Sequence, residues 1–335
     1  MRIGLALPHY DFSFPDAGPV TWERVAQAAG RAEALGFDSI WISDHLFLDL
    51  ARYGGTDEPA GSLEPFTALA ALSTATTRVR LGTLVACSPF RHPAHLVKLS
   101  TGVDLLSGGR FDLGIGAGWY EREFDAFGYD FGGVGERFAA LEDSVAAVAA
   151  LFRSEPATLD TPTVTFHEAY NRPPPAQAGG PPIWVGGKGG DRLLRLVAAH
   201  GSGWNTVWRW TPEAHRERAT RLREIADAQG RDPTTVRLSV GLYTLVGENE
   251  ADLAARYRAL QAWAPGGSLD DVSLEGYAED ALVGTPQACL DRLAAFAETG
   301  VEEMIVGAAS VPFAVHDWSA LDIVSEAIIP AAHDL

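Results

Sequence analysis

The amino-acid sequence predicts an α/β fold, a (β/α)8 TIM barrel with insertions, and three observations lead to it. Short apolar runs alternate with longer stretches whose apolar residues recur at spacings of three and four, the patterns of strands and amphipathic helices. This strand–helix unit repeats eight times, and strict alternation is typical of parallel strands joined by helical crossovers. The chain has 335 residues, which exceeds the ~250 of a typical barrel and leaves room for insertions. A doubly wound open sheet is the alternative, but such sheets rarely contain eight evenly spaced units.

Eight short apolar runs are predicted to form the strands. Each is rich in β-branched, aromatic or aliphatic residues, and each is bounded by polar or glycine-containing loops. In chain order they cover residues 3–7, 38–42, 79–85, 111–115, 183–185, 203–207, 237–245 and 303–307.

The stretches between these runs are predicted to form helices. Thr211 and Thr285 precede prolines where helices begin, which is a typical N-terminal signal. Gly36 and Gly230 stand where helices end, because glycine tolerates the left-handed conformation of a C-terminal cap. The predicted helices cover residues 21–35, 64–74, 93–106, 135–152, 192–200, 212–228, 250–262, 286–299 and 317–329.

The sequence predicts a single TIM-barrel domain over residues 1–335 with two insertions. The first lies near 153–182, and its letters TVTF and HEAYN predict a short hairpin before the fifth strand. Residues 172–182 form the richest Pro/Gly stretch, but the same strand–helix pattern continues on both sides of it. The second insertion, near 264–280, is polar and glycine-rich. It is interpreted either as a lid over the barrel mouth or as a surface excursion.

The charge balance excludes several classes of partner. Lys and Arg number 26 against 44 Asp and Glu, which gives a formal net charge of −18. Nucleic-acid binding and docking on an anionic membrane both require a basic surface, so neither partner is expected. Cys87 and Cys289 cannot build a disulfide framework, and no apolar run approaches the ~18 residues of a membrane span. A cytoplasmic protein is therefore expected.

The residues that follow the strands are the candidate functional residues, because TIM-barrel enzymes carry their chemistry at the C-terminal ends of the strands. These positions are rich in glycine, aromatic residues and histidine, a composition suited to a flat heteroaromatic ligand and a small-molecule substrate. In chain order they include His9, Asp44, His45, Phe90, Gly116, Gly118, Trp119, the run 186–190, Trp208 and Phe313.

A glycine-rich run, GGKGG at residues 186–190, follows the fifth strand and opens a helix. Bare glycines let backbone N–H groups approach a phosphate, and the helix N-terminus adds positive potential. The run matches neither a P-loop nor a dinucleotide-binding fingerprint, and a flexible loop that caps the helix is the alternative. Lys188, Arg192 and Arg91 are the cations predicted to face an anionic cofactor tail.

A second glycine-rich run, GIGAGW at residues 114–119, has part of the spacing of a dinucleotide-binding fingerprint. No helix is predicted to begin directly after it, and Trp119 and Tyr120 follow the glycines, so this signal is weak. The small residues are interpreted instead as a surface that lets a planar ring lie against the backbone.

His45 follows Asp44 at the end of the second strand and is the candidate for proton transfer, because imidazole titrates near neutral pH. A loop histidine with a capping role is the alternative. No HxH or HExxH spacing occurs, so no metal site is predicted, and the GxSxG signature of serine hydrolases is absent. Glu121 and Glu123 are placed on a mobile loop, which argues against the carboxylate pair of a glycosidase.

Several segments resemble one known family in order and spacing. They are WISDH (41–45), LGTLV (81–85), SPFRHP (88–93), KLSTGVDLLSGGRFDLGIGAGWYEREFDAFG (98–128), GERF (135–138) and PPIWVGGKGGDRLLRLVAAHGSGWN (181–205). Together they resemble the bacterial luciferase-like flavin-dependent oxidoreductases, and more closely the branch that uses the deazaflavin coenzyme F420. The resemblance is strong over residues 1–205 and continues more weakly through 283–306, which matches the closing unit of the barrel.

The resemblance implies a cofactor ring in the C-terminal mouth of the barrel and a phosphate in the loop after the fifth strand. It also implies a non-proline cis peptide at Leu84–Val85, behind the ring. His45 would act as proton donor or acceptor, or would stabilise the anionic deazaflavin. The implied cofactor-binding residues are Asp44, His45, Leu84, Val85, Ala86, Gly116, Gly118, Trp119, Gly186, Gly187, Lys188, Gly189 and Gly190.

The function implied by the resemblance is a coenzyme F420-dependent oxidoreductase, which transfers a hydride between the deazaflavin and an organic substrate. Sugar-phosphate dehydrogenases of this branch carry a Glu where this chain has Trp119, so the implied substrate is apolar or aromatic. The residues assigned to the substrate are His9, Phe90, Trp119, Trp208 and Phe313.

Two alternatives stay open. An FMN-dependent monooxygenase would use dioxygen and reduced flavin from a separate reductase, and a non-catalytic flavin-binding protein would have lost turnover. Binding of the deazaflavin and not of FMN would exclude the monooxygenase. Some members of the family form dimers through helices near the second and third strands, so a homodimer is also compatible with the sequence.

Overall fold

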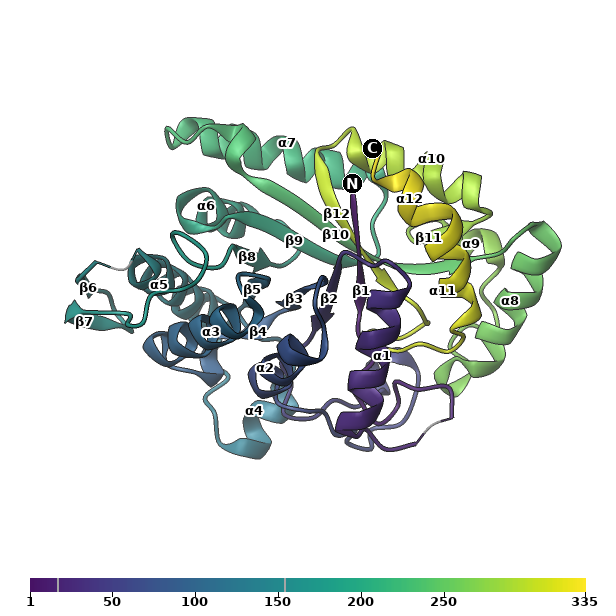
Figure 1. Ribbon diagram of the computed structural model, residues 1–335, viewed down its shortest axis with the longest axis horizontal. Helices are drawn as coiled ribbons and strands as arrows, with labels where there is room; N and C mark the ends of the chain where they lie inside the picture. Colours follow the sequence, from purple (N-terminus) through teal and green to yellow (C-terminus); the bar gives the residue numbers. More distant parts are fainter. Residues whose placement is uncertain (17, 154) are drawn as a thin grey trace.

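Eight parallel strands close into a barrel in the computed structural model, which describes residues 1–16, 18–153 and 155–335 (Figure 1). Neighbouring strands pair in parallel, and the last strand of the chain returns to pair with the first. The predicted TIM barrel is therefore confirmed. Around the ring the strands are β1 (Arg2–Ala6), β2 (Ser39–Ile42), β3 (Arg80–Thr83), β5 (Phe111–Gly116), β8 (Ile183–Gly186), β9 (Gly203–Trp208), β10 (Arg237–Val246) and β12 (Val301–Gly307).

The third strand was predicted as one continuous run over residues 79–85. The structure divides this run into two short strands. The strand β3 ends at Thr83, a cis peptide joins Leu84 to Val85, and the short strand β4 (Ala86–Cys87) then pairs with β5. The cis peptide that the family resemblance implied is thus present. A second non-proline cis peptide, at Val207–Trp208, lies at the end of β9 and was not anticipated from the sequence.

Helices cover the outside of the barrel, and each begins or ends close to its predicted residue. The hydroxyl of Thr21 accepts a hydrogen bond from Arg24 N, and that of Thr211 accepts one from Ala214 N, so both cap helix N-termini. The long outer helices are α1 (Trp22–Ala34), α2 (Pro65–Ala75), α3 (Pro93–Ser107), α5 (Val134–Phe152), α6 (Asp191–His200), α7 (Pro212–Ala228), α8 (Glu250–Trp263) and α10 (Pro286–Ala297), followed by α11 (Ser319–Ile323) and α12 (Ile329–Ala332).

One helix was not predicted. Glu121 and Glu123, placed on a mobile loop by the sequence analysis, lie on the helix α4 (Glu121–Phe127), so that placement is wrong. Gly128 ends the helix in the left-handed conformation (φ +73°), and the buried side chain of Phe124 anchors it to the protein. The helix is short, and it follows the end of β5 at the mouth of the barrel.

The two predicted insertions contain additional elements. Strands β6 (Ala157–Asp160) and β7 (Thr165–Ala169) pair antiparallel as a hairpin that projects at one edge of the molecule (Figure 1). Residue 154 of this segment lies outside the described residues. The second segment carries the helix α9 (Leu274–Ala278), whose Tyr277 packs in a buried cluster with Tyr243 and Tyr257, and the short strand β11 (Leu282–Gly284) follows it.

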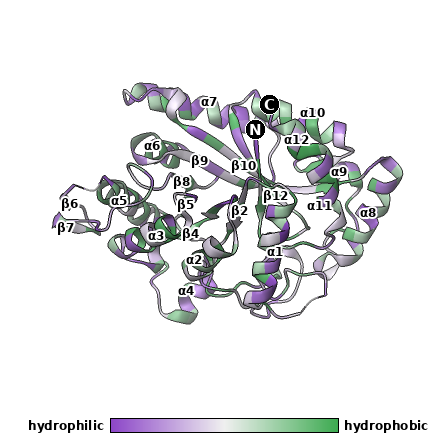
Figure 2. Ribbon diagram, viewed as in Figure 1, coloured by the Kyte–Doolittle hydropathy of each residue, from purple (hydrophilic) through white to green (hydrophobic). Residues whose placement is uncertain are grey.

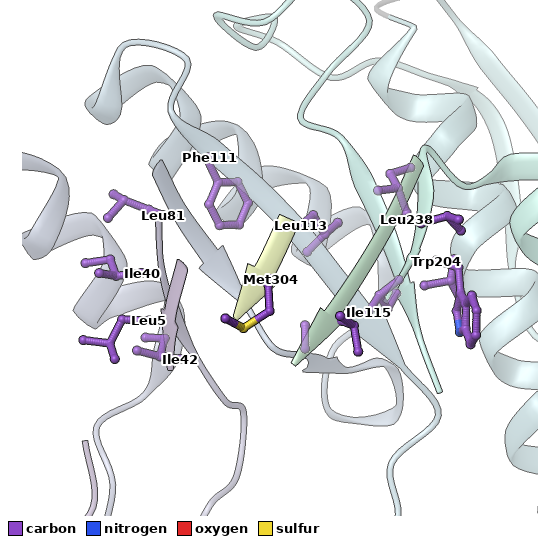
Figure 3. Close-up of a cluster of buried hydrophobic side chains, with 14 of the residues drawn as sticks. Leu5, Ile40, Ile42, Leu81, Phe111, Leu113, Ile115, Trp204, Leu238 and Met304 are labelled. Atoms are coloured by element: carbon purple, nitrogen blue, oxygen red, sulfur yellow. The ribbon is translucent and has the colours of Figure 1, made fainter. Parts of the chain in front are cut away.

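The main hydrophobic core lies between the strands and the outer helices. Successive strand residues point alternately outward and inward, and the outward set consists of large aliphatic and aromatic side chains. The outer helices carry both hydrophobic and hydrophilic residues along their length (Figure 2). Figure 3 shows part of this core, with Leu5, Ile40, Ile42, Leu81, Phe111, Leu113, Ile115, Trp204, Leu238 and Met304 labelled.

Inside the barrel, large side chains lie opposite glycines. A Cβ atom on Gly82 would overlap the Trp41 ring, and a Cβ atom on Gly116 would lie 2.7 Å from Val85 Cγ2. The glycines therefore provide the space that these interior side chains occupy. The same relationship joins Trp184 with Gly203, and Trp208 with Gly241 and Gly307.

Within the described ranges, no helix combines the length and the apolar character that crossing a membrane requires.

Candidate active site

Aromatic side chains from several strand ends meet at the C-terminal mouth of the barrel. His45 follows β2, and its ring centroid lies 5.5 Å from that of Trp119, which follows β5, in an edge-on contact. Trp208, at the end of β9, contacts Phe313 after β12 with ring centroids 5.6 Å apart. Leu84 belongs to the same buried cluster as Phe313. The structure thus places these predicted residues around one mouth.

His45 is held by the carboxylate of Glu123, which is not among the residues predicted for the site. Its Nδ1 lies 2.8 Å from Glu123 Oε1, and Glu123 Oε2 accepts a hydrogen bond from Leu46 N at 2.8 Å. The Glu123 side chain is 1% exposed and that of His45 12%. An ionised carboxylate only accepts hydrogen bonds, so Nδ1 carries the hydrogen. Nε2 has no partner among the described residues and is the atom available for proton transfer.

One sequence pattern indicates that Glu123 lies on a helix. Phe124 and Phe127 are three residues apart and Gly128 follows them, which is the pattern of a short amphipathic helix with a glycine cap. A helix there places Glu123 one residue before a buried phenylalanine, at a fixed position relative to the end of β5.

Asp44, the predicted neighbour of His45 in the site, connects two loops. Its Oδ2 accepts hydrogen bonds from Cys87 N at 2.8 Å and from Arg91 Nη1 at 2.5 Å. Arg91 also donates to Glu64 Oε1 at 2.7 Å. Two carboxylates thus neutralise Arg91, and its role as a cation facing a cofactor tail stays a prediction. The buried Asp44 instead fixes the segment that follows the Leu84–Val85 peptide.

His9 lies behind the mouth and is 1% exposed. Its Nδ1 donates to Leu7 O at 2.7 Å, which leaves Nε2 to accept from Ser43 Oγ at 3.0 Å. Ser43 Oγ in turn lies 2.5 Å from the Tyr10 hydroxyl. Burial is the main reason why the pKa of His9 falls to about 4, so the ring is neutral at pH 7. Both nitrogens are engaged within the protein, and His9 offers no free atom to a substrate.

Val85 occupies the space next to the glycines that were expected to lie against a cofactor ring. A Cβ atom on Gly114 or Gly186 would lie 2.9 or 2.8 Å from Val85 Cγ1. Gly116 faces the same side chain, and a contact between these glycines and a planar ring stays a prediction. Gly118 (φ +78°) instead packs against Phe124 and Cys87. Ala86 points into the main core.

The glycine loop after β8 has two halves. Its first residues are tied to β9, and its open half, Gly189 and Gly190, leads into the start of α6. Gly187 N donates to Asn205 O at 3.1 Å, which ties the start of the loop to β9. Gly189 adopts φ +74°, and Gly190 precedes α6 without any side-chain cap. The first N–H groups of α6 therefore lack side-chain acceptors from the cap position. Lys188 donates to Val207 O at the end of β9, and burial lowers its pKa.

The cations around this loop differ from those predicted. Arg192 is paired with Glu142 through hydrogen bonds of 2.8 and 2.7 Å, and its role as a cation facing an anionic tail stays a prediction. Arg218, on α7, lies beside the loop, since its Cβ is 3.4 Å from the position of a Cβ on Gly189. Arg218 is exposed and makes no ion pair or hydrogen bond with the described residues. It was not identified from the sequence, because its helix is distant in the chain.

The remaining aromatic residues divide into two groups. Phe90 packs against Phe124 and Tyr129, with both centroid distances 5.0 Å, and so supports α4 beside the mouth. Trp119 is 41% exposed, and Trp208 is stacked on Tyr243 at 5.5 Å. These two indoles offer apolar surface at the mouth itself. Across the described parts of the chain, no group of three His, Cys, Asp or Glu side chains could hold a metal ion.

Comparisons with known proteins agree with this architecture. The sequence profile of the luciferase-like monooxygenase family matches residues 1–303. A phthiodiolone/phenolphthiodiolone dimycocerosates ketoreductase of Mycobacterium tuberculosis is 29% identical over 263 residues, which are 72% of this chain and 67% of that protein.

Two solved structures share the fold. One is an F420-dependent secondary alcohol dehydrogenase in complex with an F420-acetone adduct. It has a TM-score of 0.76 at 22% sequence identity, and the superposition covers 99% of this chain and 98% of the dehydrogenase chain. An EDTA monooxygenase from Chelativorans sp. BNC1 has a TM-score of 0.77 at 18% sequence identity. The superposition covers 100% of this chain and 93% of the monooxygenase chain. The profile match spans most of the chain, and the barrel accounts for the structural likeness. The chain belongs to the luciferase-like monooxygenase family.

Proposed function

We propose that the chain is a coenzyme F420-dependent oxidoreductase, which transfers a hydride between the deazaflavin and an organic substrate with apolar or aromatic character. The observation that carries the proposal is the His45–Glu123 pair, a proton-transfer group in fixed orientation beside the exposed indole of Trp119. The likeness to a ketoreductase and to an F420-dependent secondary alcohol dehydrogenase supports this class of reaction.

The residues at the mouth fit a cofactor with a flat ring and an anionic tail. Lys188 and Arg218 supply positive charge at the glycine loop, and the uncapped start of α6 supplies backbone donors beside Gly190. Leu84 and Val85 would support the ring from behind, and His45 would lie beside it. The glycine loop would hold the phosphate, because its open half combines these donors with the two cations.

When bound, the coenzyme would supply the hydride chemistry. His45 Nε2 would accept the hydroxyl proton of an alcohol in the oxidation direction, and would return a proton to the carbonyl oxygen in the reduction direction. Glu123 keeps the hydrogen of His45 on Nδ1 and stabilises the imidazolium once Nε2 is protonated. The indoles of Trp119 and Trp208 would pack against the substrate and keep water away from the reacting bond.

A titration of the purified protein with the two candidate cofactors tests the proposal. We expect saturable binding of F420 and no measurable binding of FMN, followed by reduction of bound F420 when an alcohol substrate is added. Binding of FMN alone, with consumption of dioxygen by the reduced flavin, would instead support a monooxygenase like that from Chelativorans sp. BNC1. Lack of turnover with a tightly bound cofactor would support a non-catalytic flavin-binding protein.

A further inference from the structure

Trp208 reaches across two neighbouring strands at the mouth of the barrel. It ends β9, which pairs with β10, and β10 pairs in turn with β12. A Cβ atom on Gly241, in β10, would lie 3.3 Å from Cζ3 of the indole. A Cβ atom on Gly307, the last residue of β12, would lie 3.0 Å from the same atom. The six-membered ring of Trp208 therefore passes over β10 and meets the end of β12.

The two glycines provide space and no special backbone conformation. Gly241 and Gly307 lie in strands, and neither adopts a left-handed φ, so alanine could take either backbone conformation without strain. A methyl group on Gly307 would nevertheless lie 3.0 Å from Cζ3 and 3.2 Å from Cε3 of Trp208. Carbon atoms pack best at about 3.5–4.0 Å. Gly241 and Gly307 thus form a recess for the ring, which we call the indole seat.

Aromatic neighbours hold the indole in this seat. Trp208 is stacked on Tyr243, with ring centroids 5.5 Å apart and 19° between the ring planes, and it meets Phe313 edge-on at 5.6 Å. Phe313 adopts a left-handed φ of +56°, which is uncommon for a large side chain. Its carbonyl accepts a hydrogen bond from the Ser13 hydroxyl at 2.6 Å. Such a conformation persists only where the surroundings hold it, so Phe313 is fixed against the indole.

The chain directly after Trp208 is anchored to the second insertion. Arg209 Cζ lies 5.3 Å from the ring centroid of Tyr277 on α9, and the guanidinium pairs with Asp280 at 2.8 Å. The carbonyl of Asp280 accepts a hydrogen bond from Trp210 N at 2.9 Å. These anchors and the aromatic neighbours restrict sideways movement of the indole. A group added to the seat would therefore push the ring toward the open mouth.

We propose that Gly241 and Gly307 are positioning residues that set substrate specificity through Trp208, by keeping its indole out of the substrate-binding space. The inference rests on the proposed function, in which Trp208 packs against the organic substrate. The recessed indole offers a stacking surface of two fused rings, which a fused aromatic body matches better than a single ring does. The seat thereby narrows the substrate class to alcohols and carbonyl compounds with a flat body of fused rings.

Packing of the barrel alone would also account for glycine at such positions. Gly82 and Gly203 make the same kind of space for Trp41 and Trp184, which are each 1% exposed in the barrel interior. Trp208 differs because it is only half-buried and lies at the mouth. A shift of its ring changes a surface that a ligand can reach, so an effect on binding distinguishes specificity from packing.

The test compares benzyl alcohol with 2-naphthalenemethanol, which carry the same hydroxymethyl group on one ring or on two fused rings. Dissociation constants are measured by 19F NMR of the cofactor-loaded protein labelled with 5-fluorotryptophan, and Trp208→Phe identifies the Trp208 resonance. In Gly307→Ala, we expect this resonance to shift and the two-ring probe to bind about tenfold more weakly, because overpacking displaces the ring. Binding of benzyl alcohol should change by less than about twofold.

Two further variants make the test specific. Trp208→Ala needs no additional space, and it should by itself lower the preference for the two-ring probe, because it removes the stacking surface. In this background the methyl group of Gly307→Ala would next meet Leu242 O at 3.3 Å, so it should lower the thermal stability less than it does in the wild type. Gly30→Ala is the matched control, since Gly30 is an exposed glycine of α1 with nothing within 4 Å of an added Cβ.

Four outcomes would overturn the proposal. They are an equal loss of affinity for both probes in Gly307→Ala, an unchanged affinity for both, an unmoved Trp208 resonance in that variant, and no saturable binding of 2-naphthalenemethanol to the wild type. The titrations measure binding and not turnover, and they can be run with F420 or FMN. If the probes bind as expected and neither is oxidised, the proposed hydride transfer fails while the role of the indole seat stands.

Discussion

The Nδ1 atom of His45 lies 2.8 Å from Oε1 of Glu123, a buried carboxylate 78 positions further along the chain. The other carboxylate oxygen accepts a hydrogen bond from Leu46 N, so the carboxylate is fixed by the residue next to the histidine it orients. Two bonds from one side chain thus couple the loop after β2 to the helix α4. The consequence is an imidazole with one defined tautomer and Nε2 free for chemistry.

Replacing Glu123 should impair catalysis more than cofactor binding. Glu123→Gln keeps the shape but removes the charge that orients and stabilises the imidazolium. General acid–base catalysis contributes about 10²- to 10⁴-fold, so we expect kcat to fall about tenfold to a hundredfold. The measurement is kcat and its pH profile with a substrate that the wild type turns over, together with the cofactor dissociation constant.

Glu121→Gln is the matched control, because Glu121 is exposed on the same helix. It should leave kcat unchanged, whereas Glu123→Asp should recover part of the activity lost in Glu123→Gln. A fall in kcat of Glu123→Gln without any change in the pH profile would mean that Glu123 serves only to hold the fold.

Replacing His45 itself should have the larger effect. In His45→Asn, the side-chain amide keeps a polar group near the position of the histidine Nδ1 atom. The amide does not titrate near neutral pH. We expect kcat to fall by about 10²- to 10⁴-fold, with the affinity for cofactor changed by less than about threefold. Stopped-flow measurement of hydride transfer isolates this step. Unchanged turnover would remove His45 from the mechanism and leave the barrel assignment intact.

The barrel could be predicted because each strand and helix leaves a local pattern. The strand predicted at 237–245 is observed at Arg237–Val246, and the helix predicted at 212–228 is observed with the same bounds. The helix α4 was missed because its seven residues give less than two turns of periodicity. Glu123 was lost from the candidate site for the same reason.

Other parts of the site depend on contacts between distant residues. Arg91 meets Asp44 across 47 positions and Arg192 meets Glu142 across 50, so the sequence could not show that both charges are neutralised. The glycines at 114 and 116 were predicted to let a planar ring lie against the backbone, but the sequence could not show that Val85, from the segment after β3, packs against them. The Leu84–Val85 cis peptide was implied by the family resemblance and by no local pattern.

The charge of Lys188 should matter for cofactor affinity. Lys188→Glu places a negative charge beside the uncapped start of α6 and the exposed Arg218, where an anionic tail would bind. We expect the dissociation constant of the cofactor to rise at least about tenfold, with a weaker dependence on salt concentration than in the wild type. Fluorescence titration at two ionic strengths measures both quantities.

Arg258→Glu makes the same charge change at an exposed position on α8, outside the glycine loop, and should leave cofactor affinity within about twofold. Arg192→Glu provides a second comparison, since Glu142 already neutralises Arg192 and the loop should lose little attraction for an anion. Equal weakening by Lys188→Glu and Arg258→Glu would show that net charge, and not the glycine loop, controls affinity.

Two buried histidines should make the protein less stable in mild acid. Burial is the main cause that lowers the pKa of His9 and of His215 from 6.5 to about 4. Between these values the unfolded chain binds more protons than the folded one, so stability is highest above pH 6.5 and falls as the pH approaches 4. Each histidine should contribute roughly 3 kcal/mol to this loss. Urea unfolding at a series of pH values measures it.

His215→Phe isolates one of these contributions away from the candidate active site. His215 donates from Nδ1 to Thr299 Oγ1 at 2.9 Å and is stacked on Trp204, a stack that phenylalanine can retain. The variant should be less stable than the wild type at pH 7.5, because the hydrogen bond is lost. It should also lose less stability on acidification, by up to about 1.4 kcal/mol per pH unit. His167 is exposed, so His167→Gln should keep the wild-type slope of the free energy of unfolding against pH. An unchanged slope in His215→Phe would mean that this imidazole is protonated at the same pH in the folded and unfolded chain.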